Sequence, residues 1–333
     1  MRPPEFWYGE SVGPWPRLLS PLATLYGAAS RLNYRLSSSQ RAPMPVICIG
    51  NLVAGGAGKT PVAMAIARYL QAAERTPHFI HRGYGGSSDG VHVDPARHGA
   101  PEVGDEALLL ARIAPTWAGA DRHALALQAA AGGADMVILD DGYQNPALIK
   151  DISIVVVDGG TGFGNGRLIP AGPLRELPSD GLARAHAAII VGEDTADADV
   201  AIAAEGPVGL PVFGARLEAD EDAQRLAGRR VLAFAGIARP QKFFATLSAI
   251  GAEIVDGLVF DDHHPYTGPE ISDIVERAKS LNAIAVTTEK DLVRLDPDWK
   301  GAIETIHVDA AWDDTAAFTG WLDERLHSVA GGE

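Results

Sequence analysis

Apolar stretches of strand length alternate with stretches of helical period along most of the chain. The strand-like stretches cover residues 43–50, 77–82, 136–139, 152–158, 187–191, 211–217, 231–237, 284–287 and 306–308. The helical stretches, in which apolar residues recur every three or four positions, cover 59–73, 104–112, 121–131, 241–250, 268–281 and 314–326. Strands that alternate with helices predict an α/β fold with a mostly parallel sheet and flanking helices.

The first 45 residues have a different pattern. Apolar residues at 18, 22, 25, 29, 32 and 36 follow at alternating steps of four and three, so they form one stripe of a helix over 18–36. Aromatic residues at 6, 7, 8 and 15 precede this amphipathic helix, and arginines at 17, 31 and 35 flank its stripe. Such a helix suits a segment that lies on an anionic membrane surface. It equally suits a helix that packs on the protein's own core, and the pattern leaves both open.

The acidic, alanine-rich stretch 194–206 is weak in both periods, and we interpret it as a junction between two units. The chain then divides into a membrane-interfacial segment (1–40), a core (41–205) and a second, smaller α/β domain (206–333). Within the last part, residues 283–333 either complete the smaller domain or return to the first sheet.

Composition and charge narrow the classes of function. The chain has 333 residues, 47% of them hydrophobic, and a net charge of −15, which argues against a general nucleic-acid-binding protein. The first 45 residues carry five arginines and two acids, a net charge of +3, so the remainder carries −18.

The single cysteine, Cys48, excludes an internal disulfide or a zinc cluster and favours a reducing compartment. The uncharged run 18–30 is too short to span a bilayer, and the N-terminus lacks the pattern of a signal peptide.

A phosphate-binding loop is the first candidate for chemistry. The strand 43–50 leads into a glycine-rich turn, and Gly58-Lys59-Thr60 opens the next helix. Backbone N–H groups of such a turn bind phosphate, the lysine reaches the outer phosphates, and the hydroxyl binds Mg²⁺. The loop is irregular, because Val53 replaces the usual first glycine and Ala54 replaces the lysine that partition-type ATPases carry. We expect nucleotide binding by Val53, Ala54, Gly55, Gly56, Ala57, Gly58, Lys59 and Thr60.

The second candidate follows the apolar strand 136–139, which ends in Asp140 and Asp141. An acid at the end of a buried strand, downstream of a phosphate loop, is the arrangement that holds Mg²⁺ in P-loop proteins. Two adjacent carboxylates repel each other, and a bound cation relieves that repulsion. We therefore predict that Asp140 or Asp141 binds the metal together with Thr60.

Further polar residues have both a functional and a structural interpretation. Arg82 ends a strand at the side of the sheet where ligands bind, but a surface arginine in a plain turn fits equally well. Arg175 and Glu176 suit phosphate stabilisation and metal binding, or a surface ion pair before a helix. Asp105 opens a helix, where a capping acid is locally favoured over a catalytic one. His263 lies among two aspartates and a second histidine, which suits proton transfer better than zinc binding.

Several strings, taken in order, resemble one family closely. They are LSPLATLYG after the aromatic N-terminus, GNLVAGGAGKTP, RGYGG, GDEALLLA, DDGYQN, GPLRE, AGIARPQKFF, DDHHPYT and TTEKD. They run from about residue 7 to about residue 295 and resemble the tetraacyldisaccharide 4′-kinases of lipid A biosynthesis.

The resemblance implies a P-loop NTPase-like kinase with ATP and Mg²⁺ as cofactors. Its substrate would be a tetraacylated glucosamine disaccharide 1-phosphate, phosphorylated on the 4′-hydroxyl. Its location would be the cytoplasmic face of the inner membrane of a Gram-negative bacterium, at the membrane surface, with no obligate protein partner implied.

The resemblance also assigns roles by position. It implies Asp105 as the base on the acceptor hydroxyl, which reverses the local interpretation, and His263 as the support of that base. It implies Lys59 and Arg175 as further catalytic residues. From the residues and the resemblance together we expect metal ligands at Thr60, Asp140, Asp141 and Glu176, and substrate contacts at Arg82, Tyr84 and Asn145.

Two departures and two rival classes bear on these expectations. His81 stands where the family often has serine, and Asn145 stands where it often has histidine, so a positive charge is lost at position 145.

One rival is a membrane-associated P-loop ATPase switch of the partition type. The other is a non-enzymatic membrane-surface binding protein whose glycine loop is structural. Phosphate transfer from ATP to a lipid A precursor distinguishes the kinase from both.

Overall fold

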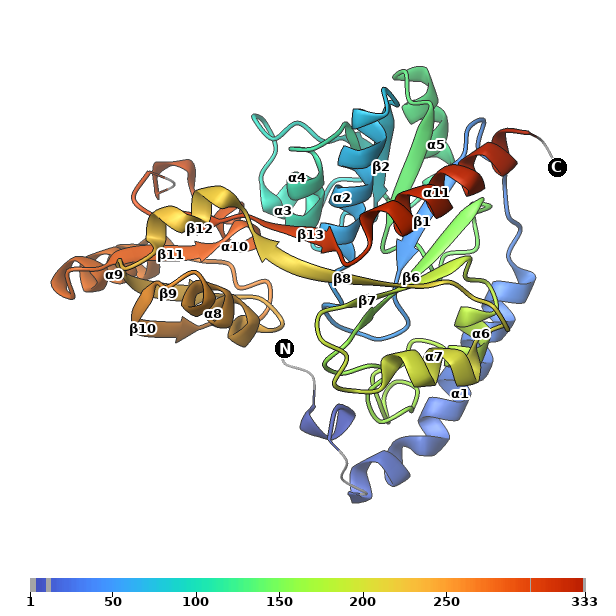
Figure 1. Ribbon diagram of the computed structural model, residues 1–333, viewed down its shortest axis with the longest axis horizontal. Coiled ribbons are helices and arrows are strands. Elements are labelled where there is room, and N and C mark those ends of the chain that lie inside the picture. Colours follow the sequence, from blue (N-terminus) through green and yellow to red (C-terminus); the bar gives the residue numbers. More distant parts are fainter. Residues whose placement is uncertain (1–3, 10–12, 300, 332–333) are drawn as a thin grey trace.

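The computed structural model describes residues 4–9, 13–299 and 301–331, and within them the strands form two sheets. The larger sheet has the strand order β13-β8-β7-β6-β1-β5-β2-β4-β3, and the smaller one has the order β10-β9-β11-β12. Figure 1 shows one lobe around each sheet. We call them the larger lobe and the smaller lobe.

The larger sheet is parallel except at its two edges. Its strands are β1 (Val46–Gly50), β2 (Pro77–His81), β3 (Val91–His92), β4 (Thr116–Ala118), β5 (Met136–Asp140), β6 (Ile152–Asp158), β7 (Ala187–Val191), β8 (Val212–Ala219) and β13 (Val308–Trp312). The edge strands β3 and β13 are antiparallel to β4 and β8, and the other neighbours pair in parallel. The predicted α/β fold with a mostly parallel sheet is confirmed, and the carboxyl ends of its central strands meet at one edge.

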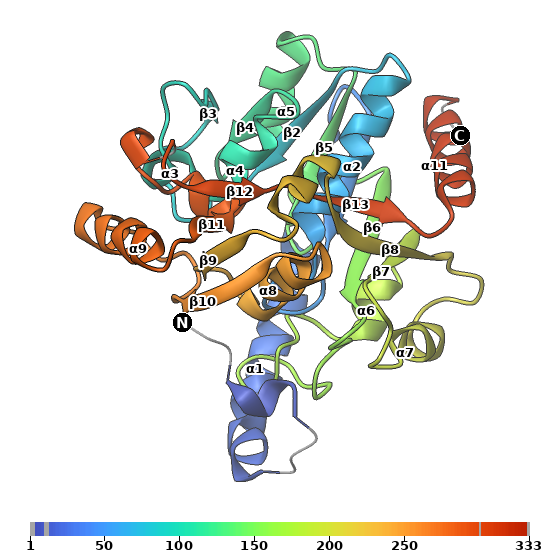
Figure 2. The same cartoon turned by 60° about the vertical axis from the view of Figure 1, so that its left-hand side comes forward.

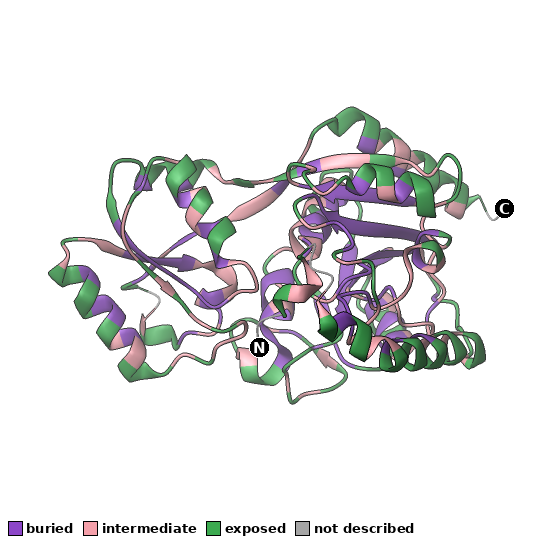
Figure 3. Cartoon of the chain, turned by 90° about the horizontal axis from the view of Figure 1, so that it is seen from below, coloured by how far each residue is buried: buried purple, intermediate pink, exposed green. Residues whose placement is uncertain are grey.

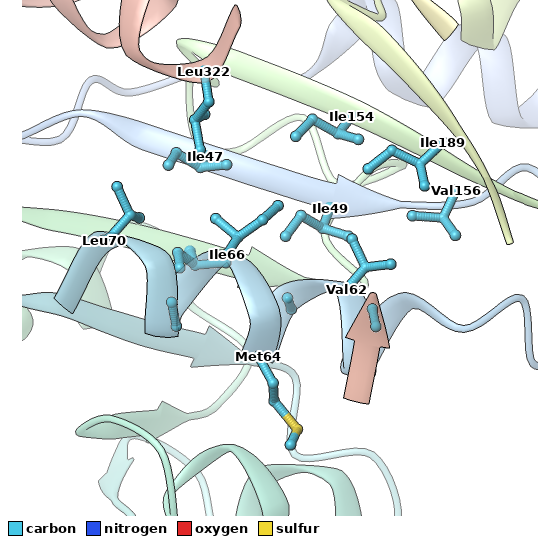
Figure 4. Close-up of a cluster of buried hydrophobic side chains, with 14 of the residues drawn as sticks. Ile47, Ile49, Val62, Met64, Ile66, Leu70, Ile154, Val156, Ile189 and Leu322 are labelled. Carbon is cyan, nitrogen blue, oxygen red and sulfur yellow. The ribbon is translucent and has the colours of Figure 1, made fainter. Parts of the chain in front are cut away.

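Helices bury both faces of this sheet. The helices α2 (Lys59–Ala72) and α11 (Thr315–Ala330) cover one face, and α5 (Arg122–Ala131), α6 (Pro178–Leu182) and α7 (Ala198–Glu205) cover the other. Figure 4 shows the first core, where Ile47 and Ile49 of β1 pack with Ile66 and Leu70 of α2 and with Leu322 of α11. Because β1 is covered on both sides, its sequence is an unbroken apolar run.

The smaller sheet is parallel throughout and is also covered on both faces. Its strands are β9 (Arg230–Ala235), β10 (Glu253–Val259), β11 (Ile284–Thr288) and β12 (Glu304–Ile306). The helix α8 (Pro240–Ala249) packs on one face and α9 (Gly268–Ser280) on the other. Short helical turns complete the chain: η1 (Glu5–Trp7), α3 (Ala100–Val103), α4 (Asp105–Leu110), η2 (Glu221–Leu226), α10 (Glu289–Leu292) and η3 (Pro297–Trp299).

The second half of the chain differs from the expected division in three places. The strand β8 pairs with β7 in the larger sheet, although we expected it in the smaller unit. The expected strand 306–308 is two strands, β12 in the smaller sheet and β13 in the larger one. The expected junction 194–206 contains α7, which packs on the larger sheet. The apolar pattern of a strand does not show which sheet the strand joins. This explains the two differences that concern strands.

The strands β8 and β13 carry the chain into and out of the smaller lobe (Figure 2). We therefore propose a core made of residues 41–219 and 308–330, with a smaller domain of residues 220–307 inserted between them. The return of the chain to the first sheet, one of the two expected alternatives, takes place from β13 onward.

The helix α1 (Pro14–Leu36) turns its predicted stripe away from the protein. The residues that it buries are Pro16, Ala23 and Gly27, which lie on a different face. The exposed leucines of the stripe are Leu18 (66%), Leu22 (55%), Leu25 (67%), Leu32 (57%) and Leu36 (75%). The helix lies along the larger lobe, and Figure 3, seen from that side, shows it mostly exposed. The stripe therefore does not pack on the protein's own core.

The described residues include no helix that is both long enough and apolar enough to cross a membrane.

Candidate active site

The phosphate-binding loop lies between β1 and α2 at the carboxyl edge of the larger sheet. Gly58 precedes α2 with a φ of 86°, and Gly55 has a φ of 128°, so both need the freedom of glycine. Gly55 and Gly56 are exposed at the tip of the loop. The helix N-terminus and the open glycine turn have the geometry that suits phosphate binding, as the sequence predicts.

Val53 does not belong to the turn. It forms an antiparallel β-bridge with Leu174, and its side chain is buried. The neighbouring Ala54 donates its N–H to the carbonyl of Pro173 at 2.7 Å, and Arg175 donates its N–H to Leu52 at 2.8 Å. The GPLRE segment therefore pairs with the start of the loop and brings Arg175 beside it.

Asp140, the last residue of β5, lies beside the loop threonine. The Thr60 hydroxyl donates to Oδ2 of Asp140 at 2.8 Å. The other oxygen, Oδ1, is buried and has no hydrogen-bond partner among the described residues. Burial first, and then the charge of Glu106, raise the pKa of Asp140 to about 6. A buried carboxylate oxygen without a donor, next to a hydroxyl, fits a divalent cation, and the oxygen ligands suit Mg²⁺.

Asp141 has partners of a different kind. Its Oδ1 accepts from Arg175 at 2.8 Å and lies 3.5 Å from Nζ of Lys59, which also donates to Asn51 at 3.1 Å. Burial acts to raise the pKa of Asp141, but the charges of Lys59 and Arg175 outweigh it and lower the pKa. Asp141 therefore holds two cations of the site ready for an anionic ligand.

Glu176 already has a donor on each oxygen. Its Oε1 accepts from Gln144 at 2.9 Å, and its Oε2 pairs with Arg184 at 2.6 Å. Gln144 also donates to the carbonyl of Asn51 at 2.8 Å. These contacts suit a role in holding Gln144 and the loop, and they leave Glu176 less available as a metal ligand than Asp140.

Asp105 faces His263 across the two lobes. Gly104, with a φ of 86°, precedes α4 and turns Asp105 into the protein, where it is 5% exposed. Nδ1 of His263, in the loop after β10, lies 3.0 Å from Oδ2 of Asp105. Arg294, just after α10, donates to the same oxygen at 2.8 Å. The two residues that the resemblance pairs are therefore in contact, although 158 positions separate them in the chain.

Glu106 is a site residue that the sequence analysis did not single out. Lys290 of α10 donates to its Oε1 at 3.1 Å, and Nε2 of His81 lies 3.2 Å from its Oε2. Nδ1 of His81 accepts from the N–H of Gly83 at 3.0 Å, so Nε2 carries the proton that it donates to Glu106. The histidine at the position of the usual serine thus binds the second acid of GDE. Glu106 and Lys290 stand inside the strings GDEALLLA and TTEKD, which is the signal that could have found them.

The three expected substrate residues have different surroundings. Tyr84 is exposed, and its ring centroid lies 5.9 Å from that of His263. Arg82 is exposed at the end of β2. The side-chain oxygen of Asn145 accepts the N–H of Ala147 at 2.8 Å, so this oxygen shapes the turn after Asp141.

These features define a class of protein. An ATP-dependent P-loop phosphotransferase has such a site. Its parts here are a glycine-rich loop, a buried aspartate that accepts from the loop threonine, and a carboxylate–histidine pair. A family model described as tetraacyldisaccharide-1-P 4′-kinase matches residues 15–327. The chain belongs to this family, and it is a kinase of lipid A biosynthesis that acts on a hydroxyl group.

Relatives over the full length support this. The chain is 48% identical to a tetraacyldisaccharide 4′-kinase of Rhodospirillum rubrum over 327 residues, 98% of each chain. It is 50% identical to that of Rhodospirillum centenum over 322 residues, 94% of each. Among solved structures, LpxK from Aquifex aeolicus in complex with ATP has a TM-score of 0.73 and 25% identity, covering 93% of this chain and 99% of the other.

Proposed function

We propose that this chain transfers the γ-phosphoryl group of ATP to the 4′-hydroxyl of a tetraacylated glucosamine disaccharide 1-phosphate, with Asp105 as the base. The observation that carries the proposal is the 3.0 Å contact between Asp105 and His263. The family match supports the substrate class.

The donor half of the site is the loop and the residues that face it. Lys59 and Arg175, which share Asp141, move to the phosphates when ATP binds and neutralise the charge on the γ-phosphate. Thr60 and Asp140 would hold Mg²⁺, which supplies further charge neutralisation on the phosphates when bound. Before ATP binds, Asp141 holds these two cations, and Glu176 holds Gln144.

The acceptor half is Asp105 with His263. Burial acts to raise the pKa of Asp105, but the hydrogen bond with His263 and the charges of Lys290 and Arg294 outweigh it and hold the pKa well below its usual range. Asp105 is therefore ionised at neutral pH and able to accept the proton of the 4′-hydroxyl. Tyr84 and Arg82 border this side of the site, which suits contacts with the sugar or its phosphate.

We propose that α1 holds the enzyme on the cytoplasmic face of the inner membrane. Its exposed leucine stripe and flanking arginines support an interfacial position. A cavity of about 220 Å³ separates α1 from Gln144 and Glu176, and Leu168 lines it as well. Residues of α1 and of the active-site segments thus line one cavity. An enzyme that lies on the membrane surface need not extract an acylated substrate entirely from the bilayer.

The test is the transfer of label from γ-labelled ATP to a lipid A precursor disaccharide by purified protein. Asp105→Ala is expected to lower turnover by about 10²–10⁴-fold, the usual contribution of a general base, while ATP still binds. Asp105→Asn keeps the shape but not the basicity and should fall in the same range. The control is Asp94→Ala, which removes a carboxylate that accepts the N–H of Ala96 outside the site. Near-normal turnover in Asp105→Ala would contradict the base assignment, and label found only in free phosphate would contradict the kinase.

A further inference from the structure

Arg294 is buried against Asp105 at the junction of the two lobes. Their side chains are 6% and 5% exposed. Nε of Arg294 donates to Oδ2 of Asp105 at 2.8 Å, and Nη2 pairs with the same oxygen. Nδ1 of His263 is the third group on this oxygen. Among the described residues, Oδ1 accepts only the N–H of Glu106, at 2.9 Å, so it keeps a free lone pair.

A second carboxylate, that of Asp291, binds the guanidinium through Nη1, the nitrogen that does not contact Asp105. Asp291 is fully buried, and its Oδ1 accepts from Nη1 of Arg294, from the N–H of Gly236 and from the hydroxyl of Tyr266, each at 2.9 Å. Its Oδ2 accepts from the hydroxyl of Thr288 at 2.6 Å. Nη1 of Arg294 also donates to the carbonyl of Gly236 at 2.8 Å. The smaller lobe thus holds Nη1 of Arg294 through Asp291 and Gly236, while Nε and Nη2 remain on Asp105.

We propose that Arg294 is a positioning residue for the transfer: it occupies Oδ2 of Asp105, so that Oδ1 takes the proton of the acceptor hydroxyl. This rests on the proposed role of Asp105 as the base. In the step, the hydroxyl oxygen bonds to the γ-phosphorus, the bond to the β–γ bridging oxygen breaks and ADP leaves. The hydroxyl proton passes to Oδ1. Because Arg294 and His263 come from the smaller lobe, the base is oriented only while the lobes are together.

The charge of Arg294, together with His263 and Lys290, also favours the ionised form of Asp105. The groups that face Asp105 are His263 after β10, Lys290 and Arg294 in and after α10, and Glu106 on α4. The positive charges of Lys290 and Arg294 favour the ionised carboxyl of Asp105, and the negative charge of Glu106 opposes it. An opposite charge this close typically lowers a carboxyl pKa by about 1–3 units. Loss of the Arg294 charge should therefore raise the pKa of Asp105.

The experiment measures the pH dependence of kcat and kcat/KM for the wild type, Arg294→Met and Arg294→Lys. The acid limb of Arg294→Met is expected to move up by about 1–3 pH units, with a lower kcat and an unchanged KM for ATP. Arg294→Lys keeps the charge but not the planar fork, so its acid limb should stay in place while kcat falls. The series is repeated in His263→Gln, which removes the other side chain of the smaller lobe that contacts Oδ2 of Asp105.

The control is Arg277→Met, which removes an exposed arginine of the smaller lobe that pairs with Asp256. The proposal is overturned if the pH profile of Arg294→Met has its acid limb at the same pH as the wild type and only a lower kcat. If Arg294→Met does not fold, Arg294→Lys decides: a reduced kcat with the acid limb in place supports the proposal, and a full kcat overturns it. Failure of the base assignment is seen separately, as near-normal turnover of Asp105→Ala.

Discussion

A single residue, Val53, explains the irregularity of the phosphate loop. Its backbone forms a β-bridge with Leu174 rather than part of the turn, and its side chain is 6% exposed. The left-handed backbone that calls for glycine occurs two and five residues later, at Gly55 and Gly58. A glycine at position 53 would therefore add nothing to phosphate binding.

Restoring the usual glycine at position 53 is expected to lower the free energy of unfolding. Val53→Gly loses a buried side chain, about 1.5–3 kcal/mol, and adds backbone freedom worth about 0.5–1 kcal/mol in the unfolded chain. We expect a loss of stability of that summed order in urea unfolding and no gain in ATP affinity by titration. Ala54→Gly, half-buried in the same loop, is the control and should lose less. Tighter ATP binding by Val53→Gly at unchanged stability would refute this account of the loop.

The site residues show how far single positions could be predicted. Lys59, Thr60 and Asp140 follow from strand–turn spacing, and they come together as expected. The partners of Asp105 could not be derived from spacing, because Arg294 lies 189 positions away and arrives through the packing of the smaller lobe. The resemblance supplied His263 but not Arg294, since the last recognised string, TTEKD, ends at Asp291.

At the scale of elements, buried strands were the most predictable. The strands 152–158 and 187–191 have the expected bounds, because each is an apolar run covered on both faces. The edge strand β10 was missed, since its residues are partly exposed and its apolar run is broken by Asp256 and Gly257. The short strands β3 and β4, with two and three residues, are below the length at which a period can be recognised.

The helix α1 carries a prediction of its own. Leu18, Leu22 and Leu25 are exposed on one stripe, so replacing all three by serine should leave the unfolding midpoint unchanged. Each leucine inserted into the interface contributes on the order of 1 kcal/mol or more, so binding to anionic vesicles should weaken about 100-fold. Sedimentation with vesicles measures the partition, and the triple isoleucine variant is the apolar control.

Substitutions test the anchor better than deletion of residues 1–36. Deletion would also remove the buried contacts of Ala23 and Gly27 and the hydrogen bond from the Tyr8 hydroxyl to the carbonyl of Ala54 at 3.0 Å. Vesicle binding by the serine variant that equals the wild type would place the membrane contact elsewhere.

In the whole molecule, a second polar contact joins the lobes on the other side of the phosphate loop. Asp158, at the end of β6, is 2% exposed and accepts from Arg239 of the smaller lobe at 2.7 Å. Lys242 of α8 pairs with its other oxygen. The Arg239 guanidinium also lies 5.8 Å from the ring centroid of Tyr8, whose hydroxyl binds the loop. Asp158, Arg239 and Tyr8 therefore connect the two lobes, the N-terminal segment and the loop in one chain of contacts.

The stability contributed by Asp158 should depend on pH in a defined direction. Burial acts to raise its pKa, but the hydrogen bond with Lys242 and the charge of Arg239 outweigh it and lower the pKa. A carboxyl whose folded pKa is lowered contributes stability above its unfolded pKa, about 3.9. That contribution is lost as the pH falls through the lowered folded value, because the unfolded chain then binds the proton first.

Asp158→Asn should therefore be less stable than the wild type at pH 7 and should approach it at pH 3. The expected difference at pH 7 is about 1.5–3 kcal/mol, the range for a hydrogen bond to a charged group, reduced because Lys242 is 47% exposed. Urea unfolding at both pH values measures it, and Asp309→Asn, which breaks the exposed pair with Arg68, is the control. A deficit of equal size at both pH values would assign the effect to packing, because only loss of an ionised carboxylate makes the difference disappear in acid.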